Sequence, residues 1–200
     1  ERSSNRSDIS DYLPLLFLET VAMKPRLIVE LGVRGGESTF VLERIARLCA
    51  ATLISVDSED CSTVSKWHEW LFVQSDDIEF AARFSRYCDN AGILPLIDVL
   101  FIDTSHEFSH TVEEIRHWFP FLSARAKVFF HDTNMKRIYR RKDGSIGVGH
   151  TATRGVIMAI ENFFGRKFKE DMDFTDYERG WLVRHYHFCC GFIILEKYAV

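Results

Sequence analysis

A short apolar stretch followed by a glycine-rich turn and an amphipathic segment constrains the fold of this chain more than any other feature. The apolar stretch is Leu27–Val29, the turn runs from Glu30 to Ser38 with the sequence ELGVRGGES, and apolar residues then recur at helical spacing over 40–48. This order predicts a strand, a tight turn and a helix. Glycines let a backbone approach a ligand closely, and the first turn of a helix presents unpaired N–H groups. The segment therefore predicts a site for a nucleotide-like cofactor.

The spacing of these glycines separates the kinds of nucleotide-binding turn. A dinucleotide fingerprint requires G-x-G-x-x-G, but Arg34 stands at its second glycine. A P-loop requires Lys and then Ser or Thr after its last glycine, but Glu37 follows Gly36. The remaining pattern, E-x-G-x-x-G-G-x-S, resembles motif I of the class I S-adenosylmethionine-dependent methyltransferases. An ordinary strand-to-helix turn without a ligand is the alternative interpretation.

In that family the glycine-rich turn lies against the methionine part of the cofactor, so the resemblance implies the same role here. The residues that it assigns to cofactor binding are Glu30, Gly32, Val33, Gly35, Gly36 and Ser38. Because motif I acids often organise the turn without touching the ligand, the role of Glu30 stays open between these two.

Strand-like and helix-like segments alternate along most of the chain. Apolar runs, several of them continuous, predict strands at 27–31, 52–56, 71–74, 97–102 and 127–130. Helical spacing predicts helices at 9–23, 38–50, 62–70, 78–90, 107–121 and 155–164. This alternation predicts an α/β fold with a doubly wound, mostly parallel, Rossmann-like sheet. Two further strands are predicted at 181–188 and 191–197, and the resemblance implies that they form an antiparallel hairpin at the end of the sheet.

Length and composition predict one domain over residues 1–200, with neither an internal repeat nor a low-complexity linker. No apolar run approaches the ~20 residues of a membrane span, so we expect no membrane partner. The net charge of −4 argues against a general nucleic-acid binder. The five cysteines are scattered without C-x-x-C spacing, which favours reduced thiols in a cytoplasmic protein.

Acidic residues lie at or within three positions of the carboxyl end of each of the five predicted strands up to 127–130, the edge at which open α/β sheets bind ligands. Asp57 comes directly after the strand 52–56, where an acid can accept both hydroxyl hydrogens of a ribose. We therefore assign Asp57 to cofactor binding. An acid at a strand end can also cap the following helix, which is the alternative for Asp57 and for Asp76.

Asp103 and Asp132 follow the predicted strands 97–102 and 127–130. Neighbouring parallel strands lie ~4.8 Å apart, so the two side chains can converge on one ion. Asp76 or Asp77 can supply a third carboxylate, and a divalent cation relieves the repulsion among carboxylates in one cleft. Hard oxygen ligands suit Mg²⁺, so we expect a magnesium site. The alternative is that Asp132 only binds a backbone turn.

His106 is the candidate for proton transfer, with Asp103 beside it in the catalytic set. It lies three residues after Asp103 at the start of the next predicted helix, so it can face the same cleft. An unperturbed histidine pKa near neutrality suits removal of a proton from a substrate hydroxyl. His110 and His117 lack a partner acid at a strand end and are predicted to be core or solvated histidines. His131 can face either the sheet or the site.

The D-x-S-H segment at 103–106 and the H-D-T segment at 131–133 resemble those of the metal-dependent sugar O-methyltransferases of macrolide and related antibiotic biosynthesis, and of the cephalosporin hydroxylase group. In the macrolide sugar enzymes, both aspartates are metal ligands, the histidine is the general base, and an acid after the third strand completes the set. The resemblance implies that Asp103 and Asp132 are metal ligands and that His106 is the general base. It also implies that Asp76 is the acid that completes the set. It covers residues 9–197 at the level of element order, and only these short motifs are specific.

Residues 134–154 interrupt the alternation with a long segment that contains a basic run from Arg137 to Lys142. A loop of this length in a compact domain is usually a functional lid, so we predict a mobile substrate cover that begins just after Asp132. A solvated basic face is the alternative. Residues 1–8 are polar and are predicted to be frayed.

Together these features predict an S-adenosylmethionine-dependent, Mg²⁺-dependent O-methyltransferase that acts on a hydroxyl of a sugar or small natural product. The expected partner is a small-molecule acceptor, and a homo-oligomer stays open. The alternatives are a non-catalytic Rossmann-like cofactor-binding module and a methyltransferase that binds nucleic acid through residues 137–142. A nicotinamide-dependent oxidoreductase is disfavoured by the missing dinucleotide fingerprint.

Overall fold

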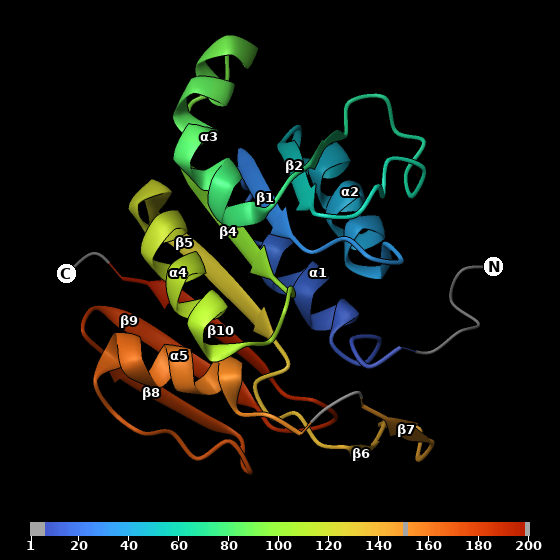
Figure 1. The fold of residues 1–200 in the computed structure, drawn as a ribbon, viewed down its shortest axis with the longest axis vertical. Helices are drawn as coiled ribbons and strands as arrows, with labels where there is room; N and C mark the ends of the chain where they lie inside the picture. The colour runs from blue at the N-terminus through green and yellow to red at the C-terminus, as the bar shows by residue number, and fades with distance from the viewer. Residues whose placement is uncertain (1–6, 150–151, 199–200) are drawn as a thin grey trace.

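The predicted alternation forms one eight-stranded sheet in the computed structural model, which describes residues 7–149 and 152–198 (Figure 1). The strands of this sheet are β1 (Leu27–Leu31), β2 (Thr52–Asp57), β3 (Leu71–Gln74), β4 (Ile97–Ile102), β5 (Leu122–His131), β8 (Phe174–Glu178), β9 (Trp181–Tyr186) and β10 (Phe192–Lys197). They lie in the order β3-β2-β1-β4-β5-β10-β9-β8. The first five are parallel and the last three extend the sheet in antiparallel order. This confirms the predicted sheet, with one antiparallel strand, β8, beyond the predicted hairpin.

Helices cover both faces of this sheet. They are α1 (Leu13–Val21), α2 (Glu37–Cys49), α3 (Asp77–Ala91), α4 (Phe108–Trp118) and α5 (Gly155–Phe164), with a short 3-10 helix, η2 (Phe119–Phe121), after α4. Figure 1 shows α1 and α2 on one face and α3, α4 and α5 on the other. One apolar core lies under each group, which explains why most residues of the central parallel strands are apolar and buried. None of the helices within residues 7–149 and 152–198 is long and apolar enough to cross a membrane.

The helix predicted over residues 62–70 is wrong, because this segment forms turns and irregular chain. Within it, the Ser65 hydroxyl accepts the N–H of Trp67 at 3.0 Å, and such local side-chain bonds compete with helical hydrogen bonds. The apolar spacing that suggested a helix comes from Trp67 and Trp70, which are buried in the core beside α2. The helix predicted over 9–23 is also shorter, since α1 begins only at Leu13.

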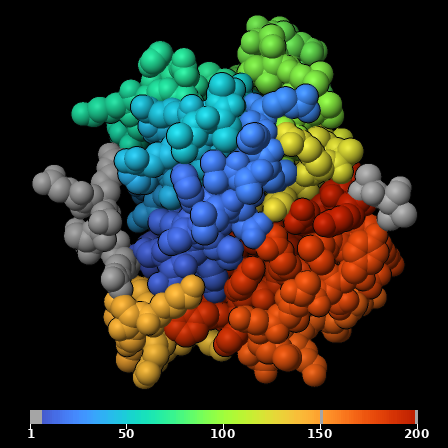
Figure 2. Space-filling model, turned by 180° about the vertical axis from the view of Figure 1, so that it is seen from behind, coloured from blue at the N-terminus to red at the C-terminus, as the bar shows by residue number. Residues whose placement is uncertain are grey.

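The segment 134–154 contains an antiparallel hairpin of β6 (Ile138–Arg140) and β7 (Ile146–Val148). The turn of this hairpin is bound to the N-terminal segment: the Lys142 N–H donates to the Asp11 carboxylate at 2.8 Å. Figure 2 shows the hairpin, in gold, beside the dark blue N-terminal segment and the red chain near β10. The predicted cover is therefore an ordered element over much of its length, and residues 150 and 151 of it lie outside the described residues.

The segment predicted to be frayed is described from Ser7 onwards, and residues 1–6 lie outside the described part of the chain. The Ser7 N–H donates to the Ser10 hydroxyl at 2.9 Å, and the Asp8 carbonyl accepts from the Cys189 thiol at 3.2 Å. Ser7 and Asp8 thus make hydrogen bonds to Ser10 and Cys189.

Candidate active site

The glycine-rich turn after β1 closes against the end of β4. Gly32 has a φ of +88°, and a Cβ at this position would lie 2.0 Å from the Asp103 carbonyl oxygen. Gly36 has a φ of +81°, and its Cβ would lie 2.1 Å from Cγ1 of Val64. Only glycine combines this backbone conformation with so close an approach. The two glycines therefore bring the turn that leads into α2 next to the first residue after β4.

Glu30, a fully buried residue of β1, organises this turn. Its carboxylate accepts hydrogen bonds from the hydroxyls of Ser38 at 2.7 Å, Thr39 at 2.9 Å and Ser55 at 2.6 Å. Burial raises the pKa of Glu30 to about 7, although these hydrogen bonds act in the opposite direction. Ser38 and Thr39 begin α2 and Ser55 lies in β2, so Glu30 ties the helix start to the neighbouring strand. Of the two predicted roles for Glu30, this arrangement favours the organising one.

Asp57, the last residue of β2, binds the backbone of the same turn. Its Oδ2 accepts the N–H groups of Val33 at 2.7 Å and Arg34 at 3.0 Å, and its Oδ1 accepts the N–H of Glu59 at 2.9 Å. Asp57 therefore does not cap a helix. A carboxylate offers about four acceptor positions, so Asp57 can still accept hydrogens from a ligand hydroxyl.

Asp103 and Asp132 meet at the ends of β4 and β5, together with two histidines. His106 Nε2 lies 2.8 Å from Asp132 Oδ2 and 3.2 Å from Asp103 Oδ1. His131 Nδ1 lies 3.2 Å and 3.3 Å from the same two oxygens. The side chains of His131 and Asp132 are buried, whereas those of Asp103 and His106 are 23% and 27% exposed. We name these four residues the strand-end cluster, which has one buried side and one side open to a ligand.

The two carboxylates of the strand-end cluster control its protonation. Burial opposes a charge on His106, but hydrogen bonds to Asp103 and Asp132 raise its pKa to about 10. The same carboxylates raise the pKa of the buried His131 well above its usual range. Burial likewise opposes ionisation of the two acids, but the charge of His131 holds the pKa of Asp103 and of Asp132 below the usual range. The carboxylates thus favour the protonated form of each ring, and the rings favour the ionised form of each carboxylate.

Unpartnered atoms and unusual backbone conformations also occur in the strand-end cluster. Asp132 Oδ1 and His131 Nε2 are buried and have no hydrogen-bond partner within the described part of the chain. His106 and Asp132 have φ values of 60° and 58°, a left-handed conformation that costs energy for residues other than glycine and recurs at active sites. A Cβ at Gly155 would lie 2.1 Å from the His106 carbonyl oxygen, so the start of α5 packs on this loop and holds it.

Asp76, the predicted third metal ligand, is not brought into the strand-end cluster. Its side chain is exposed, and its Oδ1 accepts the Glu79 N–H at 2.9 Å as the N-cap of α3. An acid in the residue before a helix satisfies an otherwise unpaired N–H group, which explains its orientation. The structure therefore places Asp76 in the capping role that was the alternative.

Asp77 instead turns inwards and reaches two residues of α4. Its Oδ1 lies 3.0 Å from His110 Nε2, and this nitrogen lies 3.6 Å from Glu114 Oε1. His110 was predicted to lack a partner acid at a strand end, and the structure corrects this point by pairing it with Asp77, three residues after β3. The sequence hides this contact because Asp77 and His110 lie on different helices.

Three residues at this site have no role assigned from the sequence: His131, a member of the strand-end cluster, and Asp8 and Cys190, which lie close to it. His131 faces the site, and its only signal in the sequence is its position directly before Asp132. Asp8 and Cys190 each place a ligand atom within 4.8 Å of one on Asp132. No sequence pattern points to Asp8 and Cys190, because they come from opposite ends of the chain.

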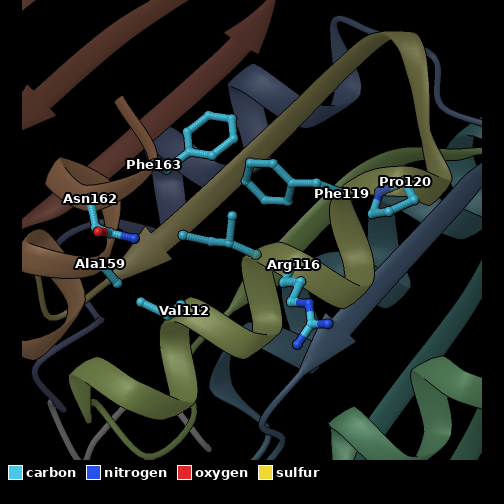
Figure 3. Close-up of a pocket in the computed structure, with 8 residues that line it drawn as sticks. Val112, Arg116, Phe119, Pro120, Ala159, Asn162 and Phe163 are labelled. Carbon is cyan, nitrogen blue, oxygen red and sulfur yellow. The ribbon is translucent and has the colours of Figure 1, made fainter. Parts of the chain in front are cut away.

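A separate hollow of about 370 Å³ lies between α4, η2 and α5 (Figure 3). The rings of Phe119 and Phe163 lie 5.1 Å apart at 77° on its wall. Its lining is mostly apolar and consists of Val112, Ile115, Arg116, Phe119, Pro120, Ala159, Asn162 and Phe163. None of the acids at the strand ends lines this hollow, so it does not belong to the candidate active site.

Solved structures with a similar fold include two methyltransferases. MycE, a methyltransferase of the mycinamycin pathway in complex with Mg, SAH and mycinamycin VI, is 17% identical with a TM-score of 0.57, over 94% of this chain and 49% of its own. CalS11, a TDP-rhamnose 3'-O-methyltransferase of calicheamicin biosynthesis, is 13% identical with a TM-score of 0.59, over 96% of this chain and 81% of its own. At these identities the likeness shows a shared fold.

Comparison of the sequence with known proteins and with family models identifies the family of this chain. The uncharacterized protein y4gI of Sinorhizobium fredii is 28% identical over 133 residues, which cover 58% of this chain but only 14% of that relative. A family model described as a methyltransferase domain matches residues 29–133, more than half of the chain and the part that runs from β1 to the end of β5. The chain therefore belongs to the methyltransferase-domain family.

Proposed function

We propose that this domain transfers the methyl group of S-adenosylmethionine to a hydroxyl oxygen of a sugar or small natural product, with the help of Mg²⁺. The observation that carries this proposal is the position of the strand-end cluster beside the glycine-rich turn. Gly32 lies against the carbonyl of Asp103, so a cofactor held by the turn is next to the carboxylates and histidines. The two acids and the proposed base of the cluster thus lie at the same edge of the sheet as the glycine-rich turn.

The cofactor would be held by the turn between β1 and α2. Gly32, Val33, Gly35, Gly36 and Ser38 form its backbone cradle, in which Glu30 fixes the start of the helix. Asp57 lies at the end of β2 and would accept the ribose hydroxyls with the acceptor positions that Val33 and Arg34 leave open. The sulfonium methyl is already activated, so the remaining task of the protein is to orient and deprotonate the acceptor.

Asp103 and Asp132 are the residues that would hold Mg²⁺. The donor set fits such an ion, because the buried Oδ1 of Asp132 has no partner in the described residues and two carboxylates face one cleft. The two protonated rings supply the compensating charge that a divalent cation would otherwise bring. When bound, the ion would lower the pKa of an acceptor hydroxyl and hold it in line. That MycE contains Mg and SAH in its complex supports this assignment.

His106 is the residue that would take the proton. Its ring is partly exposed, and its Nε2 already faces both carboxylates, so it can reach an acceptor bound between them and the turn. The ionised carboxylates of Asp103 and Asp132 hold the pKa of His106 at about 10 when no metal ion is bound to them. Neutralisation of these carboxylates lowers that pKa towards neutrality and frees the ring to act as a base. Nε2 of a neutral His106 would accept the hydroxyl proton as the acceptor oxygen takes the methyl group and S-adenosylhomocysteine leaves.

A sugar hydroxyl is the acceptor class with the best support. CalS11 is a TDP-rhamnose 3'-O-methyltransferase and the MycE complex contains the macrolide mycinamycin VI. The hairpin of β6 and β7 follows directly from the strand-end cluster, and its Arg137–Lys142 run would face an anionic part of the acceptor, such as a nucleotide diphosphate.

Methyl transfer to a panel of nucleotide sugars and glycosylated macrolides tests this function. We expect His106→Gln to keep S-adenosylmethionine binding while transfer falls by about 10²–10⁴-fold, the usual contribution of a general base. His117→Gln, on α4 and outside the strand-end cluster, is the matched control and should keep full activity. Transfer that survives both His106→Gln and a chelator of divalent ions would contradict the proposal.

A further inference from the structure

A second cluster of ionisable side chains lies between α3 and α4 and uses none of the residues of the strand-end cluster. It consists of Asp77, His110 and Glu114, which place one ligand atom each within 4.8 Å of one another. His110 Nε2 lies 3.0 Å from Asp77 Oδ1 and 3.6 Å from Glu114 Oε1. The Thr104 hydroxyl donates to Glu114 Oε1 at 2.5 Å. We name these three ionisable residues the interhelical cluster.

Both carboxylates of the interhelical cluster are buried and only partly satisfied. The Asp77 side chain is 8% exposed and the Glu114 side chain is 0% exposed. Asp77 Oδ2 and Glu114 Oε2 have no hydrogen-bond partner anywhere in the described residues. Buried polar atoms in folded proteins nearly always have a partner. Two such oxygens in one cluster therefore indicate a partner that the protein chain does not supply.

The surroundings of the interhelical cluster favour the protonated forms of Glu114 and His110 when no metal ion is bound. Burial and the nearby Asp77 raise the pKa of Glu114 to about 8, and the hydrogen bond to Asp77 raises the pKa of His110 to about 9. A metal ion can replace such protons, because ligands bind it in their deprotonated forms. His110 and Glu114 lie four residues apart on one face of α4, and Asp77 is the first residue of α3, so the donors converge from two helices.

We propose that Asp77, His110 and Glu114 bind a divalent transition-metal ion. One imidazole nitrogen with two carboxylates matches sites with three protein ligands and open positions for water. Mg²⁺ prefers oxygen ligands alone and suits this donor set less well. The ion would join the start of α3 to α4 and, through Thr104, hold the loop that carries His106. Metal binding here can be tested whether or not the domain transfers a methyl group.

Titration with Co²⁺, followed by its visible d–d absorption and by equilibrium dialysis, tests this site. The protein carries Asp103→Asn and Asp132→Asn, which remove the carboxylates of the strand-end cluster, so bound cobalt reports on the interhelical cluster alone. We expect about one ion per chain, the single-site stoichiometry. His110→Gln in this background should abolish binding, and His110 is partly exposed, so this change should not unfold the chain. His117→Gln, on α4 but paired with Glu113, is the matched control and should keep the ion.

Circular dichroism establishes that each variant is folded, and Glu114→Gln provides a second test of the ligand set. Two results would overturn the proposal. One is absence of cobalt binding in the folded Asp103→Asn/Asp132→Asn protein, and the other is binding that neither His110→Gln nor Glu114→Gln reduces. His110 would then only share a proton with the neighbouring carboxylates. If the aspartate changes unfold the chain, the same titration of the otherwise wild-type chain is decisive. There, His110→Gln should bind one ion fewer, and an equal number would overturn the site.

Discussion

Gly32 and Gly92 both have positive φ, 88° and 68°, but their surroundings differ. A Cβ at Gly32 would lie 2.0 Å from the Asp103 carbonyl, whereas nothing lies within 4 Å of one at Gly92. We expect Gly92→Ala to lower the free energy of unfolding by ~1–2 kcal/mol, the cost of a left-handed conformation. Gly32→Ala should cost more and should also abolish cofactor binding, because the turn must move away from β4. Urea unfolding and calorimetric titration with S-adenosylmethionine measure both effects, and equal results for the two variants would contradict the role of Gly32.

Glu30 should make the stability of the protein depend on pH. Its pKa in the folded protein is about 7, above the ordinary value of 4.5. The folded protein favours the neutral form of Glu30. The stability that this form contributes is therefore fully present below about pH 4.5 and is lost as the pH rises through about 7. Relative to wild type, Glu30→Gln should gain stability over this range, on the order of 1–3 kcal/mol.

Chemical unfolding at several pH values measures this difference for Glu30. Glu37→Gln removes an acid of the same turn that is not buried beside hydroxyl groups, and so serves as the control. A stability difference between Glu30→Gln and wild type that stays constant across the range would show that Glu30 ionises as it does in an unfolded chain.

At the scale of elements, the start of α3 decides which of two adjacent acids faces solvent and which faces the interior. Asp76 caps the helix, so Asp76→Ala should lower the free energy of unfolding by ~1 kcal/mol, the usual cost of losing an N-cap. Asp76→Ser keeps a capping oxygen but removes the carboxylate, so its stability should stay close to wild type. We expect Asp76→Ser to keep Mg²⁺ binding and methyl transfer as well. Loss of metal binding in this folded variant would return Asp76 to the magnesium site.

Element order was predictable from the sequence because burial imposes a clear pattern. Strands β1 and β4 are buried at every position and are apolar except for Glu30 and Asp98, as expected for strands of a sheet that is covered on both faces. The prediction of a helix around Trp67 was wrong because two buried tryptophans three residues apart have the spacing of a helix face. The Ser65 side chain binds the backbone there, which competes with helical hydrogen bonds. The β6–β7 hairpin was not predicted, because strands of three residues are too short to show alternation.

At the scale of the whole molecule, the sequence predicted the part of the candidate site that lies at the ends of adjacent parallel strands. Asp103 and Asp132 follow adjacent strands, so the strand ends bring them together, and His106 follows within a few residues. The rest depends on the path of the chain in three dimensions. The contact of Asp77 with His110 needs two helices to pack, and the approach of Asp8 to Asp132 needs the N-terminal segment to cross the sheet edge. No periodicity within one segment carries such information.

The claim that Asp103 and Asp132 form a magnesium site beside the cofactor is tested most directly by one comparison. Mg²⁺ is titrated calorimetrically into the protein saturated with S-adenosylhomocysteine, for wild type and for Asp132→Asn. We expect wild type to bind about one Mg²⁺ per chain, and Asp132→Asn to lose that binding while its affinity for S-adenosylhomocysteine stays unchanged. Equal Mg²⁺ binding by the two proteins, or none by the wild-type complex, would contradict a magnesium-dependent mechanism at this site.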